Sequence, residues 1–273
     1  MKEKTDTEIF AQEARATPLE RYFRIIEVLC GVQEGLSLSE IAVLLGLPRQ
    51  SAHRLLASMR EAQLVDVTGG RNQIYAVAER VRRLATLALS DTLVQSVALD
   101  VLKRLSAEVG ETSYIARLMG TSIRSVAMES PDVPWRGYVL PGKILLPHAT
   151  ASGKAIMAYQ PSEIIENALS GKLEKPTMKT MNKTETKRDY ALIRDRGYAT
   201  CIGEVNESLA ATAVPVFIDE VGVQFSLGIV GPLERITKLL AADVPSRLKI
   251  HAKSLSSALS ISGRNRDHDS LSA

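Results

Sequence analysis

The chain has 273 residues, of which 45% are hydrophobic and 24% are charged. This length exceeds the usual span of one domain, and this composition excludes disordered and membrane-embedded proteins. No segment approaches the roughly 18 apolar residues that a membrane helix needs. The formal net charge of +3 does not by itself indicate a nucleic-acid binder, so any electrostatic argument depends on where the charges lie. Only Cys30 and Cys201 are present, which argues against a disulfide scaffold; we expect a cytoplasmic protein of two domains that contacts no membrane.

The first part of the chain, after a polar and disordered tail expected over residues 1–17, has the pattern of three helices followed by a β-hairpin. Apolar residues recur at helical spacing over residues 19–32. Ser39 is a good N-cap for a second, short helix, and Pro48 starts a third. The buried face expected for the second helix consists of Ile41, Ala42, Leu44 and Leu45. Two short strands follow, joined by a turn at a pair of glycines. This order predicts a winged helix-turn-helix domain over residues 18–80.

The third helix combines an apolar inner face with a polar outer face at its start. Its apolar stripe consists of Ala52, Leu55, Leu56 and Met59. Long polar side chains occupy the opposite face of its first turns, namely Arg49, Gln50, His53 and Arg54. In a helix-turn-helix this outer face enters the major groove, where Arg suits guanine, Gln suits adenine, and Ser51 at the helix start can hold a phosphate. We therefore assign DNA binding to these residues.

The distribution of charge supports the same assignment. Residues 1–48 contain five basic and eight acidic side chains, a net of −3, whereas residues 49–83 contain seven basic and three acidic ones, a net of +4. Arg71 lies at the expected tip of the wing, where it would reach a backbone phosphate or the minor groove. The competing interpretation is an ordinary solvated helix face. The bend, the wing and the charge asymmetry together favour DNA reading.

A long helical pattern then leads into a segment of mixed structure. The linker helix is expected over residues 81–109, within a pattern that starts at Glu79 and has its break near Ser90. Strands are expected in the segments TSYIARLMG, SIRSVAMES, RGYVLPGKILL, YATCIGEV, ATAVPVFI and GVQFSLGIVG, and helices over 151–159, 161–169, 183–196 and 244–261. The mixture predicts an α+β domain with a largely antiparallel sheet over residues 110–262, followed by a disordered tail, residues 263–273.

At this point the chain resembles the IclR family of bacterial transcriptional regulators. The segments that carry the resemblance, over residues 18–260, are LSEIAVLLGLPRQSAHRLLASM, GETSYIARL, LLPHATASGKAIMAY, RDRGYAT and VPVF…LGIVGP. It implies a winged helix-turn-helix reader, a linker helix and a GAF-like α+β domain that binds a small effector. It further implies homodimers, commonly paired into homotetramers, on a pseudo-palindromic double-stranded DNA operator.

The resemblance also implies the positions of the effector pocket. The effector carboxylate would meet the backbone N–H groups of Ala151 and Ser152 at a helix start. Other pocket positions, several of them polar in the family, are occupied here by Cys201, Leu209, Ala211, Gly228 and Val230. Because the departures remove polarity, we expect an aromatic or largely apolar effector. Trp135 and Tyr138 are assigned to the pocket wall, although core packing is an equally good interpretation for them.

Other function classes are weighed against the regulator. The segment ATASGKA lacks the spacing of a phosphate loop, and the four histidines are scattered, so neither a cofactor nor a metal is expected. Glu204 and Glu207 lie near the expected pocket as a possible acid/base pair, but no nucleophile accompanies them, and we expect no enzyme. A small-molecule enzyme with a DNA-binding appendage and a ligand-independent architectural DNA binder remain as alternatives. The sequence leaves repressor and activator equally open.

Overall fold

The computed structural model describes residues 17–32, 34–70, 72–219 and 221–260. The chain forms two compact units, which meet in sequence between Ala85 and Thr86. Each unit has its own hydrophobic core. Within the described residues, no single helix is long and apolar enough to cross a membrane. The helices Glu79–Leu87 and Asp91–Val109 pass that test of length and composition only together, as a bent pair.

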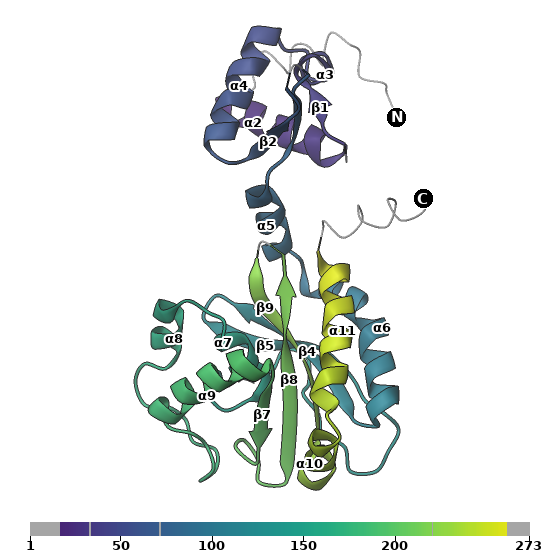
Figure 1. Ribbon diagram of the computed structural model, residues 1–273, viewed down its shortest axis with the longest axis vertical. Helices are drawn as coiled ribbons and strands as arrows, with labels where there is room; N and C mark the ends of the chain where they lie inside the picture. The colour runs from purple at the N-terminus through teal and green to yellow at the C-terminus, as the bar shows by residue number, and fades with distance from the viewer. Residues whose placement is uncertain (1–16, 33, 71, 220, 261–273) are drawn as a thin grey trace. The chain divides into compact units, whose positions relative to one another are not determined.

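The N-terminal unit packs three helices against a small antiparallel sheet whose strand order is β1-β3-β2 (Figure 1). Its elements are α2 Pro18–Cys30, β1 Leu36–Ser37, α3 Leu38–Leu44, α4 Arg49–Glu61, β2 Val65–Thr68 and β3 Ile74–Val77, and α5 Glu79–Leu87 follows. Its core gathers apolar side chains from each of the three helices and from the sheet, with Ile25, Ile41, Leu56, Met59 and Tyr75 among its most buried members. The helices and the hairpin that the sequence predicts are confirmed, whereas β1 was not predicted.

The short helix α3 differs from its prediction in its start and in its buried face. Its N-cap is Ser37, not Ser39: the Ser37 hydroxyl accepts from the Glu40 N–H at 3.3 Å, and the Glu40 carboxylate accepts from the Ser37 N–H at 2.7 Å. Of the four residues predicted to be buried, Ile41, Ala42 and Leu45 are confirmed, since they share one face at helical spacing. The prediction for Leu44 is wrong, because it lies on the opposite face and is 60% exposed.

The C-terminal unit is an α+β domain built on one antiparallel sheet of strand order β6-β5-β4-β9-β8-β7. Its elements are α6 Asp91–Val109, β4 Thr112–Met119, β5 Ser122–Glu129, β6 Ile144–Leu145, α7 Ala151–Met157, α8 Ser162–Ala168, α9 Lys183–Arg196, β7 Ala199–Ile202, β8 Leu209–Ile218, β9 Gly222–Pro232, α10 Leu233–Ala241 and α11 Val244–Leu259. Helices α6, α10 and α11 cover one face of the sheet, and α7 with α9 lies on the other (Figure 1). The sheet therefore separates two apolar clusters.

Two predictions for this unit need correction, and one is confirmed. Only Ile144–Leu145 of the segment expected as a strand over residues 136–146 is a strand, because Pro141 and two glycines interrupt the run. Helix α10 was not predicted; it follows β9 directly and is separated from α11 by a two-residue turn. The expected break in the long helical pattern is confirmed, since Ser90 caps α6 by accepting from the Leu93 N–H at 3.2 Å.

Candidate DNA-reading helix and effector cavity

Helix α4 places the predicted DNA-binding side chains on the solvent side of its first two turns. Arg49, Gln50, His53 and Arg54 are exposed, and Ser51 is half-buried. On the opposite side Ala52, Leu56 and Met59 are buried in the core of the unit. The N-cap of α4 is Pro48, which supplies no side-chain hydrogen bond, so the first N–H groups of α4 have no side-chain cap. Arg71, the predicted contact of the wing, lies outside the described residues.

The turn between α3 and α4 fixes where α4 starts. Gly46 adopts a φ of 64°, which favours glycine, and lets the chain reverse immediately after α3. The Leu47 N–H then donates to the carbonyl of Ala42 at 2.9 Å. Ala42 itself is 7% exposed, as expected of a small residue at the contact between the two helices. This short, hydrogen-bonded turn therefore fixes the start of α4 relative to α3.

The C-terminal unit encloses a cavity of about 480 Å³ on the face of the sheet that carries α7. Its walls come from β4, β7, β8 and β9, from the start of α7 and from neighbouring loops. Apolar lining residues include Val139, Leu145, Leu146, Val205, Leu209 and Val230. Polar lining residues are Lys143, Thr150, Glu174, Cys201 and Asn206, and the tyrosines Tyr114 and Tyr138 also line the cavity. The cavity is thus mainly apolar, with polar groups at a few points.

The sheet register explains why some predicted pocket residues meet at the cavity and others do not. Cys201 lies opposite Ala211, and Ala211 opposite Val230, so these three form one row across β7, β8 and β9. The predicted residues that line the cavity are Tyr138, Ala151, Cys201, Leu209, Ala211 and Val230. Ser152, Gly228 and Trp135 are not among the lining residues. Tyr114 and Asn206, which do line it, were missed by the sequence analysis; the alternation of β4 could have placed Tyr114 on this face.

The assignment of Trp135 to the pocket wall is wrong. Its side chain is 87% exposed, and its backbone has a φ of 54° in a loop rather than in a strand. Arg235, which pairs with the buried Glu111, donates to the carbonyls of Pro134 at 3.2 Å and Trp135 at 2.9 Å. Since the main chain of this loop is held inward by these bonds, the indole projects into solvent.

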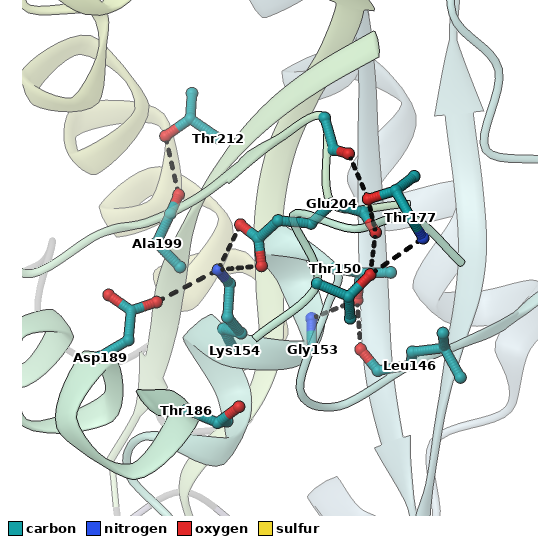
Figure 2. A network of polar contacts seen from close by, with 12 residues as sticks. Leu146, Thr150, Gly153, Lys154, Thr177, Thr186, Asp189, Ala199, Glu204 and Thr212 are labelled. Atoms are coloured by element: carbon teal, nitrogen blue, oxygen red, sulfur yellow. Dashed lines mark hydrogen bonds and ion pairs between the residues drawn. The ribbon is translucent and has the colours of Figure 1, made fainter. Parts of the chain in front are cut away.

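A buried ionic network joins α7, α9 and the loop after β7 (Figure 2). The ammonium group of Lys154, which is wholly buried on α7, contacts both oxygens of the Glu204 carboxylate at 2.8 and 3.0 Å and Oδ2 of Asp189 at 3.2 Å. Asp189 in turn accepts from Arg196 at 3.1 Å. The hydroxyl of Thr180 donates to the main-chain carbonyl of Glu204 at 2.6 Å. The network thereby fixes Glu204, in the loop after β7, to α7 and α9. The two residues that follow Glu204 in this loop, Val205 and Asn206, line the cavity.

The ionisation of Glu204 follows from this setting. Burial raises the pKa of the Glu204 carboxyl, and the neighbouring Lys154 opposes part of that rise. Glu207 is exposed, so the two glutamates do not share one environment. Burial also raises the pKa of the Cys201 thiol, with Glu204 adding to the rise. In the described part of the chain, no three His, Cys, Asp or Glu side chains are placed to hold a metal ion.

Both units match models of known protein families. The C-terminal domain of bacterial IclR transcriptional regulators matches residues 86–257, and the IclR helix-turn-helix domain matches residues 18–68. The chain belongs to the IclR family. The predicted family and fold class are confirmed, and membership in this family of transcriptional regulators agrees with the expectation that the chain is not an enzyme.

Individual IclR-type proteins are similar over most of the chain. The "Probable transcriptional regulator SauR" of Cupriavidus necator is 29% identical over 219 residues, which are 80% of this chain and 86% of that protein. The HTH-type transcriptional regulator TtgV of Pseudomonas putida is 29% identical over 215 residues, 78% of this chain and 81% of that protein. A solved IclR homologue from Microbacterium hydrocarbonoxydans, complexed with 4-hydroxybenzoate, shares 22% identity and has a TM-score of 0.57, covering 89% of this chain and 99% of that one. The last likeness shows a shared fold.

Proposed function

We propose that this IclR-type regulator binds a pseudo-palindromic DNA operator through α4, and that an aromatic or largely apolar small molecule in the cavity modulates this binding. The observation that carries the proposal is that one chain holds both an exposed polar helix start and a mainly apolar cavity of ligand size. Clefts that hold small ligands typically measure about 300–1,000 Å³. A ligand-independent architectural DNA binder would not require a cavity for a small molecule.

The DNA-binding part of the proposal rests on side chains that are free to meet a groove. Arg49, Gln50 and His53 are exposed on consecutive turns of α4 and would face base edges. Ser51 and the N–H groups at the helix start would hold a phosphate. Arg54 and Arg71 would add contacts to the DNA backbone, the latter from the wing.

The effector part rests on the composition of the cavity. A polar molecule with many hydroxyl groups would lose hydrogen bonds to water against Val139, Leu145 and Val230, at a cost of roughly 1–3 kcal/mol for each unsatisfied group. The N–H group of Ala151 would remain for one anionic or phenolic oxygen, since Thr150 caps only the Gly153 N–H, whereas the Ser152 N–H is directed at Tyr114 and Ser152 does not line the cavity. The likeness to a fold that holds 4-hydroxybenzoate supports the same class of ligand.

The two sites would communicate through the junction of α5 and α6. Arg117 of β4 is 7% exposed, and its guanidinium donates to the carbonyls of Leu87 and Leu89 and contacts Asp91 at 3.3 Å. The same strand carries Tyr114 in the cavity wall. A ligand that favours one arrangement of β4 would therefore bias the helix that leads to the DNA-binding unit.

The assembly that we propose is a homodimer, with two dimers forming a tetramer. One recognition helix reads only a few base pairs, so two copies would be needed on half-sites about one helical turn, roughly 34 Å, apart or a multiple of it. A footprint over a single unrepeated half-site, together with a monomeric mass in light scattering, would contradict this arrangement.

The proposal is tested by measuring melting temperature and operator affinity with the same set of compounds. Ligands that bind the native state raise the melting temperature, since binding stabilises it by RT ln(1 + [L]/Kd). We expect aromatic acids, phenols or hydrocarbons to raise it and to change operator affinity. If micromolar glyoxylate or pyruvate stabilises the protein while the apolar set changes neither quantity, the proposed effector class is wrong. If no compound changes operator affinity, the architectural alternative is favoured.

A further inference from the structure

Tyr114 of β4 is a nearly buried aromatic residue in the wall of the effector cavity, with 2% of its surface exposed. The sheet register places it directly opposite Gly228 on β9, and Gly228 opposite Ala213 on β8. All three lie on the face of the sheet that carries the cavity. Small residues therefore follow Tyr114 across the sheet, on the neighbouring strand β9 and on the next strand, β8.

Gly228 makes room for this ring. A Cβ atom at position 228 would lie 3.0 Å from Cζ of Tyr114, 3.0 Å from Cβ of Ala213 and 3.0 Å from the carbonyl oxygen of Thr212. The glycine is therefore needed for the close approach of the ring. Because Cζ carries the hydroxyl, the polar end of Tyr114 extends across β9. Gly228 thus affects the cavity through Tyr114, without lining the cavity itself.

Two polar groups near Tyr114 come from α7 and β7. Ser152 on α7 and Cys201 on β7 both act on the ionisation of Tyr114, and Cys201 lines the cavity. Burial raises the pKa of Tyr114 to about 12, although Ser152 opposes part of the rise. The phenol therefore stays protonated, and able to donate a hydrogen bond, throughout the physiological pH range.

The hydroxyl of Ser152, near Tyr114, is a buried group whose hydrogen bonding is incomplete. Its side chain is wholly buried, and within the described ranges its hydroxyl completes no hydrogen bond of ordinary geometry. A buried hydroxyl without a partner is costly, so its position beside a phenol is significant. Since a phenol oxygen can accept one hydrogen bond while its O–H donates another, Tyr114 can accept from Ser152 and donate to a ligand at the same time.

We propose that Tyr114 determines the specificity of the cavity by donating a hydrogen bond to a single oxygen of an otherwise apolar ligand, with Ser152 as its positioning partner. This inference rests on the proposed function and narrows its ligand class to compact molecules with one aromatic or alicyclic body and one hydroxyl or carbonyl oxygen near Tyr114. The apolar walls around Val139 and Val230 would hold the body of the molecule.

The test compares two probes that differ by one hydroxyl, 4-ethylphenol and ethylbenzene, with the full-length protein in titration calorimetry. In the wild type we expect 4-ethylphenol to bind about tenfold more tightly, the size of one hydrogen bond. Tyr114→Phe should reduce this ratio to within twofold of unity while leaving the Kd of ethylbenzene within threefold. Tyr159→Phe is the matched control, since Tyr159 is a half-buried tyrosine of the same unit that does not line the cavity, and it should keep the wild-type ratio.

A second variant tests whether Gly228 makes the room that the ring of Tyr114 needs. Gly228→Ala places a Cβ against Tyr114 and should lower the preference for 4-ethylphenol in protein whose melting curve remains cooperative. If both probes bind and Tyr114→Phe keeps the wild-type ratio, the role of Tyr114 is refuted while the apolar effector site stands. If neither these probes nor any other apolar compound binds, the proposed effector class fails, and this inference fails with it.

Discussion

The proposed DNA-reading helix carries its polar groups on the surface, whereas the unit with the proposed effector cavity has charged groups in its interior. On α4, Arg49 and Gln50 extend into solvent from a helix whose other face is apolar core. In the C-terminal unit, the ammonium of Lys154 and the carboxylates of Asp189 and Glu204 lie beneath the surface, within a few ångströms of one another. An exposed side chain is hydrated in the free protein, so its removal costs little stability, whereas a buried charge depends on its partners for solvation.

This difference indicates how each region can change. The surface of α4 can acquire a new base preference without a change in folding, because stability is carried by Ala52, Leu56 and Met59 on its inner face. The cavity cannot vary so freely, because the loop that carries Val205 and Asn206 is fixed by the Lys154 network. Mutations on the outer face of α4 should therefore change DNA binding and leave stability unchanged, whereas mutations in the Lys154 network should lower stability.

The largest effect is expected from Lys154→Met. It leaves Glu204 and Asp189 buried without their shared counter-charge, and breaking a buried ion pair typically costs about 3–5 kcal/mol of unfolding free energy. Urea denaturation measures the loss. Lys143→Met, at the exposed rim of the cavity, is the control and should stay within about 0.5 kcal/mol of wild type.

The pH dependence of the same variant has a definite sign. The pKa of Glu204 is already raised by burial, and loss of Lys154 raises it further. A carboxyl whose folded pKa is raised favours the folded state at pH values below its unfolded pKa, and this contribution is lost as pH rises through the folded pKa. The stability deficit of Lys154→Met should therefore be smaller at pH 5 than at pH 8. Adding Glu204→Gln should recover part of it; a deficit that is equal at both pH values would show that charge burial is not its cause.

On α4 the expected effect is on affinity alone. Arg49→Ala or Gln50→Ala should weaken binding to the specific operator by about 1–3 kcal/mol and relax the preference at one base pair, because each removes a contact to a base edge. Melting temperature should not change. Arg188→Ala removes the same charge from an exposed position on α9 and serves as the control. Wild-type affinity of both α4 variants at matched salt would overturn the assignment of the recognition helix.

The sequence predicted the parts of this comparison that follow from periodicity. The polar face of α4, the break at Ser90 and the helix Lys183–Arg196 were predicted because spacing and capping residues determine them locally. The exposure of Trp135 was not predictable, since it depends on Arg235, about a hundred residues away, holding the loop. The role of Tyr114 depends in the same way on Gly228, a neighbour on another strand.

A variant at the α5–α6 junction tests whether the two regions communicate. Arg117→Met removes the donors to the carbonyls of Leu87 and Leu89 without touching the cavity lining. The ligand-induced rise in melting temperature should persist, whereas the ligand-induced change in operator affinity should fall at least about fivefold, since coupling energies are typically 1–3 kcal/mol. Arg104→Met, on the exposed side of α6, is the control. Full coupling in Arg117→Met would locate the connection elsewhere.

The smallest effect is expected from Val230→Ser in the cavity wall. The substitution removes apolar surface from a residue that lies in the same row as Cys201 and Ala211, and it introduces a hydroxyl where an apolar ligand offers no partner. At about 0.8 kcal/mol for each buried methylene-sized group, binding of an apolar ligand should weaken about fivefold. A ligand with a second oxygen should lose less or gain, because the new hydroxyl can pair with it. Titration of wild type and variant with ethylbenzene and with 4-hydroxybenzoate measures both changes. If the affinity for both compounds changes by the same factor, Val230 contributes only packing, and the apolar character of this wall does not select the ligand.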